Sequence, residues 1–436
     1  MRLNIEDFAK IKEADIIIDG ITVIAGENNT GKSTVGKILF SMFNSLQNIE
    51  DKILDDRAVA VRNSCIAPFF KHVRINSSDF SDYVWITGTD FYRSVFAELK
   101  EISEKNNMIT QEVVADTVQK VMKLLRINLD NVTDVETAIQ NICENIMTVW
   151  NVPEETIIRE RISRYFNKVF STQINMLSDK EYKESVLTLK IKEKHQKVIF
   201  QNNDCVKYEQ ETEINHKAIY IDNPLIIDYL GSKKGLNPME EMLTDLLNED
   251  KDDIFSGVVE KILTEEKLTN IYKMLQTVVD GEIVVDQNKK FCLKSGKFKE
   301  PIILQNLSTG LKSFVILKML LENGSLKEKD VVILDEPEIH LHPQWQIVYA
   351  ELIVLLQKTF DLSIIVTTHS PYFVDALNLF SRKYETDDKV NYYLSSNIDN
   401  MVQMEHVSDH IDSIYRKMVS PIQVLDTLRK EKLEDK

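Results

Sequence analysis

The sequence predicts an α/β fold: a mixed central sheet flanked by helices, with an antiparallel β layer and a large helical insertion. Three observations lead to this prediction. Wholly apolar runs of strand length lie near both ends of the chain, as expected of buried parallel strands. Alternating polar and apolar residues at 185–201 and 281–296 predict antiparallel strands. In the middle of the chain, apolar residues recur at helical spacing, which predicts an inserted helical bundle.

The composition fits a large globular chain. With 436 residues and 43% hydrophobic content, it can form one large domain or two smaller ones. No apolar run reaches the roughly 18 residues of a membrane-spanning helix, and residues 1–18 carry acidic side chains, unlike a secretory signal. The four cysteines are scattered, so a reduced cytoplasmic compartment is expected. The net charge of −16 argues against bulk attraction to nucleic acid but leaves room for a local basic groove.

The first element is a strand, loop and helix at residues 21–46. The loop matches G-x-x-x-x-G-K-[ST] at Gly26, Gly31, Lys32 and Ser33. A compact apolar run precedes it, and the following helix is apolar on one face, so the context of the motif matches as well. The residues on that helical face are Val35, Ile38, Leu39, Met42 and Phe43.

This loop predicts a site for a nucleoside triphosphate. Its glycines let backbone N–H groups turn toward phosphate oxygens, and the helix N-terminus adds a positive dipole end. Lys32 can reach the β- and γ-phosphates, and the Ser33 hydroxyl can bind Mg²⁺. The alternative is a glycine turn that only caps a helix. The residues expected to contact ATP here are Gly26, Glu27, Asn28, Asn29, Thr30, Gly31, Lys32, Ser33 and Thr34.

Helices dominate the middle of the chain. One of them begins with Thr133 and Glu136 in the pattern of a capping box. The first three are each about 15–20 residues long, which suits a compact bundle better than a long coiled coil. The predicted helices lie at 109–127, 133–150, 154–170, 237–250 and 252–280.

Residues 151–200 are more basic than the rest of the chain, with ten Lys or Arg side chains against seven acidic ones. Eight of these could face the phosphate backbone of a nucleic acid. The alternative is that they lie on ordinary solvated faces. The eight are Arg159, Arg161, Arg164, Lys168, Lys190, Lys192, Lys194 and Lys197.

A second candidate anion site lies at residues 306–321. Ser308 is expected to cap a mostly apolar helix, and Gly310 leaves its first turn bare for close approach of a ligand. The alternative is an ordinary helix cap.

The apolar run at 331–334 predicts a central parallel strand that ends in two acids. At the carboxyl edge of such a sheet, Asp335 is expected to bind Mg²⁺, directly or through water. Glu336 is expected to act as general base on the attacking water. The alternative is a pair of solvated acids at a strand end.

The next apolar run, 364–366, also predicts a strand, and His369 stands just past its end. There it can reach a γ-phosphate, or hold the water and Glu336 in line; the alternative is a structural histidine. His340 and His342 alternate in an extended segment, but no third ligand is evident nearby, so a metal site is not favoured.

These motifs in this order resemble the ABC-class ATPases, in the branch with Rad50, the SMC proteins, RecF and the OLD-family ATPases. The opening of the chain, through "ENNTGKST", is similar to that branch. The segments "LDEPEIHLHP" and "THSPYFVDAL" are similar to its bacterial OLD-like members, including the ATPase subunit of Septu-type anti-phage systems. The resemblance is strong over residues 1–45 and 300–380.

The resemblance implies an ABC-type P-loop ATPase head with a large helical insertion. The head would comprise an N-terminal lobe, a β layer and a C-terminal lobe. These parts are expected at 1–50, 185–230 and 281–436, with the helical insertion at 51–184 and a further helical segment at 231–280.

Roles for particular residues follow from the resemblance. Asp335 and Glu336 would be the Walker B acids, and His369 the switch histidine. Residues 307–310 would be the signature, although they read LSTG rather than the start of LSGGQ, and 338–343 would lie at the dimer-facing loop.

The family's Q-loop glutamine has no secure counterpart. Asp222 or Asn223 could replace it, since they follow an apolar run at about the expected point. The alternative is an ordinary strand-to-turn signal.

The implied function is an ATPase that uses Mg²⁺, binds ATP between the two heads of a homodimer, and controls a partner effector. A nuclease is the expected effector, in phage defence or DNA repair. Two alternatives stay open: a nucleotide-binding subunit of a membrane transporter, and a nuclease in its own right. The tail after His369 shows no acidic cluster of the kind found in the Toprim nucleases fused to OLD proteins. It is expected to form strands at 390–396 and 401–407 and a helix near 420–432.

Overall fold

The computed structural model divides the chain into two compact units, residues 1–47 with 162–436, and residues 48–161. The smaller unit ends before the limit of the insertion expected at 51–184. The C-terminal half of α7 (Glu154–Phe170) lies in the larger unit, where the Phe166 ring centroid is 4.7 Å from that of Phe200. The structure describes residues 1–72, 88–105, 108–125, 127, 135–176, 184–231, 235–248, 258–287, 290–398, 401–419, 425 and 428–429.

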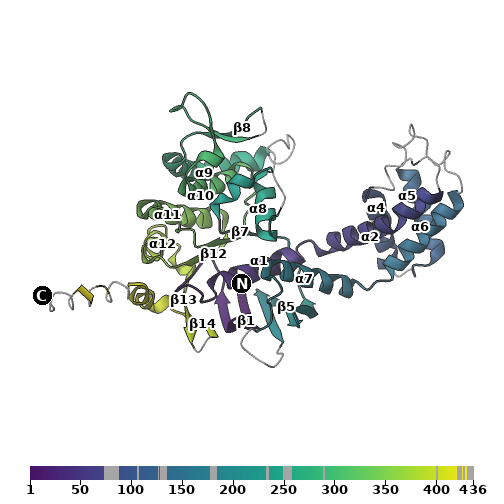
Figure 1. Ribbon diagram of the computed structural model, residues 1–436, viewed down its shortest axis with the longest axis horizontal. Coiled ribbons are helices and arrows are strands. Elements are labelled where there is room, and N and C mark those ends of the chain that lie inside the picture. The colour runs from purple at the N-terminus through teal and green to yellow at the C-terminus, as the bar shows by residue number, and fades with distance from the viewer. Residues whose placement is uncertain are drawn as a thin grey trace. The chain divides into compact units, whose positions relative to one another are not determined.

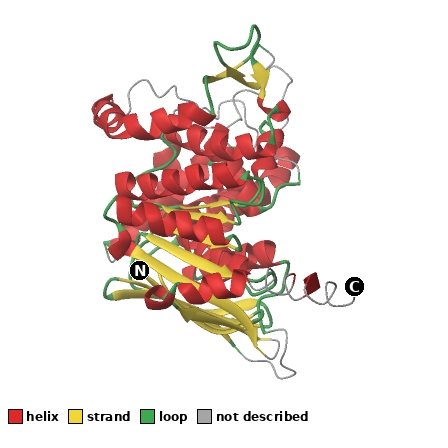
Figure 2. Ribbon diagram, turned by 90° about the vertical axis from the view of Figure 1, so that its left-hand side faces the viewer, coloured by secondary structure: helices red, strands yellow, loops and turns green. Residues whose placement is uncertain are grey.

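One large sheet forms the centre of the larger unit, drawn in yellow in Figure 2. Over the described residues it has eleven strands in the order β6-β5-β4-β1-β2-β14-β13-β3-β12-β11-β7. Their labels are shown in Figure 1 where there is room. The strands are β1 (Arg2–Phe8), β2 (Ile11–Ile17), β3 (Ile21–Gly26), β4 (Ser185–Ile191), β5 (Lys194–Gln201), β6 (Asp204–Gln210), β7 (Ala218–Ile221), β11 (Val331–Asp335), β12 (Ser363–Thr368), β13 (Val390–Ile398) and β14 (Met401–His406).

The sheet has a parallel half and an antiparallel half. Strands β13, β3, β12, β11 and β7 run parallel to one another. Strands β2, β1, β4, β5 and β6 are paired antiparallel, and β14 joins the halves by running parallel to β2 and antiparallel to β13. A mixed sheet with an antiparallel layer is the fold class that the sequence predicts, and this prediction is confirmed.

The strands that carry the predicted motifs are neighbours in the parallel half. The three apolar runs at 21–25, 331–334 and 364–366 form β3, β11 and β12, as expected. Strand β12 lies between the other two: Thr367 pairs with Asp335 of β11, and Thr368 pairs with Ala25 of β3. The carboxyl ends of all three strands therefore meet at one edge of the sheet.

The prediction for the hairpin at 281–296 is wrong in one respect. Its strands β8 (Glu282–Val285) and β9 (Phe291–Lys294) do form, but they join β10 (Ile302–Ile303) in a separate three-stranded sheet rather than the antiparallel layer. Alternating polarity identifies a half-buried strand without specifying the sheet it joins. The expected turn residue Asn288 lies outside the described residues.

Helices pack against the large sheet (red in Figure 2). The motif helix α1 (Lys32–Leu46) packs on β7, β11 and β12, and its predicted apolar face is at most 3% exposed. Gly36 allows this close packing, because a Cβ there would lie 2.7 Å from Cγ2 of Ile333. The other helices of this unit include α8 (Pro238–Asn248), α9 (Val258–Val278), α10 (Thr309–Glu322), α11 (Pro343–Phe360) and α12 (Pro371–Lys383), with the 3-10 helices η2 (Pro224–Tyr229), η3 (Leu304–Asn306), η4 (Asp387–Lys389) and η5 (Ser408–His410).

The smaller unit is helical. Its apolar side chains, including Phe96, Val118 and Ile146, form a core of their own. The capping-box residue Thr133 lies outside the described residues, whereas Thr110 caps α5 through the Val113 N–H. Two of the helices, α2 and α4, are not among those predicted from the sequence. In α2, charged residues interrupt the apolar spacing. The helices are α2 (Ile49–His72), α4 (Asp90–Glu104), α5 (Gln111–Leu124), α6 (Val135–Trp150) and the first half of α7.

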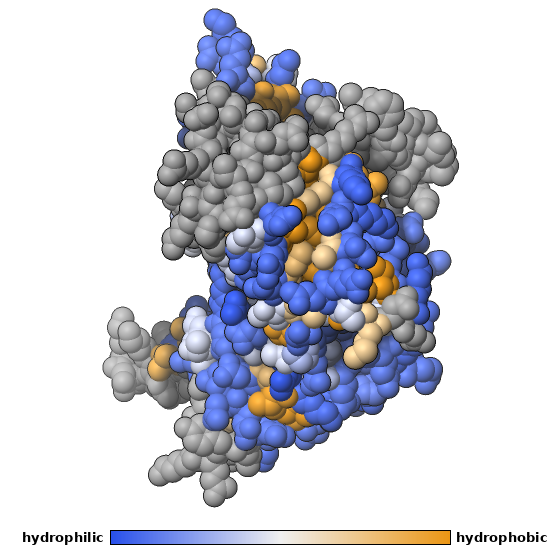
Figure 3. Space-filling model, turned by 90° about the vertical axis from the view of Figure 1, so that its right-hand side faces the viewer, coloured by the Kyte–Doolittle hydropathy of each residue, from blue (hydrophilic) through white to orange (hydrophobic). Residues whose placement is uncertain are grey.

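The tail after His369 contributes two strands to the large sheet. The strands predicted at 390–396 and 401–407 are β13 and β14, whereas most of the helix predicted near 420–432 lies outside the described residues. Among the described residues on the face drawn in Figure 3, hydrophilic residues cover most of the area and hydrophobic residues lie in separate areas. No helix in the described part of the chain is long and apolar enough to cross a membrane.

Candidate functional site

The predicted phosphate loop connects β3 to α1 in a conformation that depends on its glycines. Gly31 has a φ of 75°, in the left-handed region, at the N-cap of α1. Gly26 lies against β13, where a Cβ would stand 2.3 Å from the Ser395 carbonyl oxygen. Both positions therefore require a residue without a side chain.

Neighbouring strands hold the loop in place. The Thr30 hydroxyl donates to the Glu27 carbonyl at 2.8 Å, and the Ser395 hydroxyl donates to the Thr30 carbonyl. The Lys10 ammonium, in the turn between β1 and β2, donates to the Asn29 side chain at 2.9 Å. Glu27, Asn28 and Asn29 are exposed, so the outer side of the loop faces solvent.

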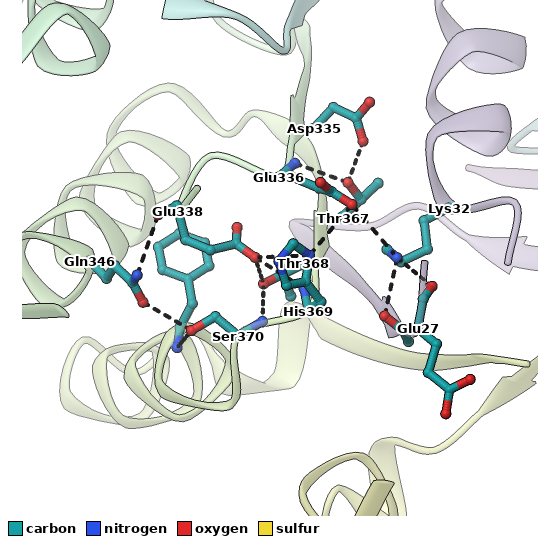
Figure 4. A network of polar contacts seen from close by, with 12 residues as sticks. Glu27, Lys32, Asp335, Glu336, Glu338, Gln346, Thr367, Thr368, His369 and Ser370 are labelled. Atoms are coloured by element: carbon teal, nitrogen blue, oxygen red, sulfur yellow. Dashed lines mark hydrogen bonds and ion pairs between the residues drawn. The ribbon is translucent and has the colours of Figure 1, made fainter. Parts of the chain in front are cut away.

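Lys32 is buried beneath this loop, with 3% of its side chain exposed. Its Nζ donates to the carbonyls of Gly26 at 3.1 Å and Glu27 at 2.7 Å, and lies 3.7 Å from Oε1 of Glu336. Burial lowers the pKa of Lys32, and the carboxylates of Glu336 and Asp335 oppose that shift. The single buried cation of the loop is thus directed toward the acids of β11 (Figure 4).

Asp335 gathers three hydroxyl groups from three elements. Ser33 Oγ donates to Oδ1 at 2.9 Å, Thr367 Oγ1 donates to the same oxygen, and Tyr220 OH donates to Oδ2 at 2.6 Å. Burial raises the pKa of Tyr220 well above its ordinary value, so its hydroxyl stays a donor. The three hydroxyl donors hold both oxygens of the Asp335 side chain in place.

Glu336 follows Asp335 with its backbone in an unusual conformation. Its φ of 50° is uncommon for a residue other than glycine, and such conformations cost about 1–3 kcal/mol. The Glu336 N–H donates to both the carbonyl and the hydroxyl of Thr367, each at 3.1 Å. This conformation places its Oε1 between Lys32 Nζ at 3.7 Å and His369 Nδ1 at 3.5 Å.

His369 lies past the end of β12, as expected, between two glutamates (Figure 4). Its Nδ1 is 3.5 Å from Glu336 and 3.9 Å from Oε1 of the buried Glu338. The structure thus brings together Lys32, Ser33, Asp335, Glu336 and His369, which the sequence predicts at separate motifs.

Ser308 and Gly310 are not part of this network over the described residues. Ser308 does occupy the N-cap of α10, but its exposed side chain makes no capping hydrogen bond, contrary to expectation. Gly310 packs closely against its own chain on the side where a Cβ would lie. A Cβ there would stand 2.8 Å from the His340 carbonyl oxygen of the same chain, so this close approach is internal.

The remaining candidate ligands have ordinary contacts. His342 caps α11, its Nδ1 accepting from the Gln344 N–H at 3.4 Å. Asn223 caps η2 by accepting from the Leu225 N–H at 3.0 Å, and exposed Asp222 follows β7. Among the residues that the structure describes, no group of three or more His, Cys, Asp or Glu side chains could hold a metal ion.

Several of the basic side chains at 151–200 are paired with acids. Arg161 donates to Asp56 at 2.7 Å, and Lys168 lies 3.4 Å from Glu241. These contacts favour the alternative of solvated faces at both positions.

Sequence reasoning missed two residues of the network, Thr367 and Tyr220, and assigned a third, Glu338, only to a dimer-facing loop. The pair Thr367-Thr368 before His369 is a signal that could have been used, because hydroxyls at a strand end can bond acids of the next strand. Tyr220 gives no such signal, since an aromatic residue within an apolar strand is ordinary.

The residues present fit Mg²⁺. The Ser33 hydroxyl and Asp335 carboxylate, 2.9 Å apart, supply the hard oxygen ligands that this ion prefers. Asp335, Glu336 and Glu338 together face one buried ammonium, that of Lys32, so the described cluster carries more acidic than basic groups.

Comparison with known proteins agrees with this geometry. The family model described as an AAA ATPase domain matches residues 1–374. The Retron Ec83 probable ATPase of Escherichia coli is 28% identical over 207 residues, covering 39% of this chain and 34% of that protein. The Septu protein PtuA of Bacillus thuringiensis is 36% identical over 88 residues, covering 17% of this chain and 22% of that protein.

The matched region thus spans about a third of the retron ATPase and about a fifth of the Septu protein. The resemblance to Septu-type ATPases that the motifs predict is confirmed at the level of sequence. An SMC head domain from Thermotoga maritima aligns with 93% of this chain and 98% of its own, at 10% identity and a TM-score of 0.36.

Proposed function

This chain belongs to the AAA ATPase domain family, and from that premise we propose that it binds ATP at residues 26–34 and hydrolyses it with Glu336 as general base. One observation carries the proposal. The carboxyl ends of β3, β12 and β11 bring Lys32, His369 and Glu336 to one sheet edge, with Glu336 within 3.7 Å of both other side chains.

Binding would use the loop and the start of α1. Backbone N–H groups of the loop and the positive end of the α1 dipole favour phosphate oxygens. The Lys32 ammonium would exchange its bonds to the Gly26 and Glu27 carbonyls for stronger bonds to the β- and γ-phosphates. Ser33 and Asp335 would hold Mg²⁺, whose charge offsets that of the phosphates.

Hydrolysis needs a base for the attacking water, and Glu336 is placed for that role. Its carboxylate would take a proton as the water oxygen bonds to the γ-phosphorus and the bond to the bridging oxygen breaks. ADP and phosphate are the products. His369, at 3.5 Å, would hold Glu336 in line or contact the γ-phosphate.

We further propose that two copies form a homodimer with ATP between them. In that arrangement the exposed Ser308 of one copy would approach the γ-phosphate bound by Lys32 of the other. The exposed Ser308 hydroxyl, which makes no capping bond, supports this role. Gly310 lets α10 pack against the His340 carbonyl of its own chain, and its main-chain N–H would remain the group that approaches phosphate.

The biological role we propose is control of a partner effector, with a nuclease as the expected partner, in phage defence or DNA repair. The names of two relatives, a retron ATPase and a Septu protein, support a defence role. Contact with nucleic acid through the basic segment at 151–200 would be secondary to that partner.

Phosphate release from ATP by the purified chain tests the enzymatic proposal. We expect release that requires Mg²⁺, stops on chelation and resumes when the ion is restored. ATP that stays intact under these conditions, with ATP binding demonstrated in the same sample, would overturn the assignment of hydrolysis. Co-purification with the product of the neighbouring gene tests the partner: a nuclease supports the proposal, and a permease contradicts it.

A further inference from the structure

Glu338 is a buried acid to which the proposed mechanism gives no role. Only 3% of its side chain is exposed. Its Oε1 accepts two hydrogen bonds, from the Thr368 hydroxyl at 2.5 Å and from the His369 main-chain N–H at 3.0 Å. Its Oε2 is buried without a hydrogen-bond partner among the described residues. A buried carboxylate oxygen without a partner is costly, so its retention calls for an explanation.

The main chain of Glu338 is fixed as firmly as its side chain. Its carbonyl accepts from the Leu341 N–H at 3.0 Å and from the Gln346 side chain at 3.3 Å. Gln346 in turn accepts from the Ser370 hydroxyl at 2.9 Å, which ties the start of α11 to that of α12. Figure 4 shows Gln346 in contact with both Glu338 and Ser370, and Glu338 in contact with His369.

The two bonds to Oε1 fall on the residues where β12 ends. Thr368 is the last residue of that strand, and His369 follows it. His369 lies past the end of β12, so its N–H is not bonded to a neighbouring strand and needs another acceptor. Glu338 satisfies it, and so decides where the main chain of His369 lies relative to Glu336.

We propose that Glu338 is a positioning residue of the ATPase site, which acts through His369 by accepting its main-chain N–H as a neutral carboxylic acid. The inference rests on the proposed function, because His369 must contribute to turnover for its position to matter. A proton on Oε2 removes the charge that this oxygen would otherwise carry without a partner. Burial also raises the pKa of Glu338, while the hydrogen bonds to Oε1 oppose that shift.

The charges around Glu338 agree with a neutral group. His369 Nδ1 lies 3.5 Å from Oε1 of Glu336 and 3.9 Å from Oε1 of Glu338, so two acids lie beside one imidazole ring. The buried ammonium of Lys32 is hydrogen-bonded to the Gly26 and Glu27 carbonyls and lies nearest to Glu336. Since Glu338 is buried within one chain, its role needs no second copy.

Two substitutions at Glu338 show whether His369 needs its hydrogen-bond acceptor or its negative charge. Glu338→Gln keeps the size of the side chain and an acceptor oxygen for the Thr368 and His369 donors, without charge. Glu338→Ala removes the acceptor. We expect Glu338→Gln to keep kcat within about threefold of wild type, and Glu338→Ala to lower kcat about tenfold or more through misplacement of His369. KM for ATP should stay within about threefold of the wild-type value in both variants.

Hydrogen exchange of the His369 amide gives a readout that does not depend on turnover. In the nucleotide-free protein, Glu338→Ala should speed this exchange about tenfold or more, because the amide loses its acceptor. Glu338→Gln should leave it near wild type, and the amides of β3 should be unchanged in both. Should Glu338→Ala fail to fold, Thr368→Val, which removes one donor without changing shape, should speed the same exchange to a smaller extent.

The outcomes distinguish this inference from the proposed function. Wild-type protein without ATP hydrolysis would overturn the proposed function, and the exchange experiment would still test the contact. Hydrolysis at the wild-type rate in Glu338→Ala, with normal exchange at His369, would overturn the positioning role. A kcat for Glu338→Gln as low as that for Glu338→Ala would show that the charge is required, and would overturn the neutral form.

Discussion

The ammonium of Lys32 lies 3.7 Å from the carboxylate of Glu336, although the two residues come from opposite ends of the sequence. Lys32 follows the loop after β3, and Glu336 follows β11; these two strands flank β12, whose Thr367 binds the backbone of Glu336. The acid and the cation are thus held in place before a nucleotide arrives. Preorganised groups of this kind stabilise developing charge without reorganisation cost.

Lys32→Ala should abolish tight ATP binding. The substitution removes the charge-assisted hydrogen bonds to two phosphates, and the loss of about 3 kcal/mol corresponds to roughly a hundredfold weaker affinity. Calorimetric titration with ATP measures it, with circular dichroism to verify folding. Lys12→Ala, at an exposed lysine of β2, is the matched control and should bind as wild type. An unchanged affinity in Lys32→Ala would contradict the phosphate-loop assignment.

Glu336→Gln should lower the rate of ATP hydrolysis about a hundredfold or more, because an amide cannot take a proton from water. ATP binding should survive, since the amide keeps the shape of the side chain. Steady-state phosphate release and a binding titration on the same sample separate the two effects. Glu13→Gln, at an exposed glutamate of β2, serves as control. Wild-type turnover in Glu336→Gln would mean that another residue is the base.

Thr367→Val should reduce kcat about tenfold, with a smaller effect on KM. Valine has nearly the same shape but loses the hydroxyl that donates to Asp335 and accepts from the Glu336 N–H. Glu336 would keep its bond to the Thr367 carbonyl, so the effect should be weaker than that of Glu336→Gln. If kcat stays at the wild-type value, the hydroxyl is not needed to hold either acid.

The elements of the site could be predicted from local patterns, but their arrangement could not. Strands β3, β11 and β12 are short apolar runs, and the loop between β3 and α1 has a recognisable spacing of glycines. That β12 lies between the other two is a property of long-range pairing, which no local pattern encodes. The strand order brings the hydroxyl groups of Thr367 and Tyr220 to Asp335, so local patterns did not identify them.

Close contacts within the chain give some residues a packing role that their sequence context does not reveal. A Cβ at Gly310 would stand 2.8 Å from the His340 carbonyl oxygen. Glu338 follows Asp335 and Glu336, and the resemblance assigns it to a dimer-facing loop. In the structure a turn, with the Leu341 N–H bonded to the Glu338 carbonyl, directs it inward. Burial of this kind depends on tertiary packing and not on periodicity.

Gly36→Ala should destabilise the protein by roughly 1–2 kcal/mol. Alanine is favoured in helices by up to about 1 kcal/mol, but the new Cβ would collide with Ile333 at 2.7 Å and contact Tyr220 at 3.2 Å. The midpoint of urea unfolding measures the balance. Gly296→Ala adds a methyl group where nothing lies within 4 Å, and should be neutral. Stabilisation by Gly36→Ala would show that α1 can move away from β11 without cost.

Ser308→Arg should keep ATP binding but lose turnover, if two copies share each site. Ser308 is exposed, so an arginine there leaves the fold intact while blocking approach of a second copy. Gly310 is unsuitable for this test, because any side chain would collide with the His340 carbonyl of its own chain at 2.8 Å. Gln201→Arg adds the same group at an exposed position of β5 and should hydrolyse ATP normally.

Mixing Ser308→Arg with Lys32→Ala protein gives the sharper test of the shared site. Each parent is expected to be inactive: one cannot complete the site of its neighbour, and the other cannot bind ATP tightly. In a mixed dimer, the intact Lys32 of the first variant meets the intact Ser308 of the second, so one of two sites is whole. ATP would bind this closed form better than the separate chains, and that differential affinity drives its formation. Phosphate release that appears only on mixing supports the shared site, whereas full activity of Ser308→Arg alone excludes it.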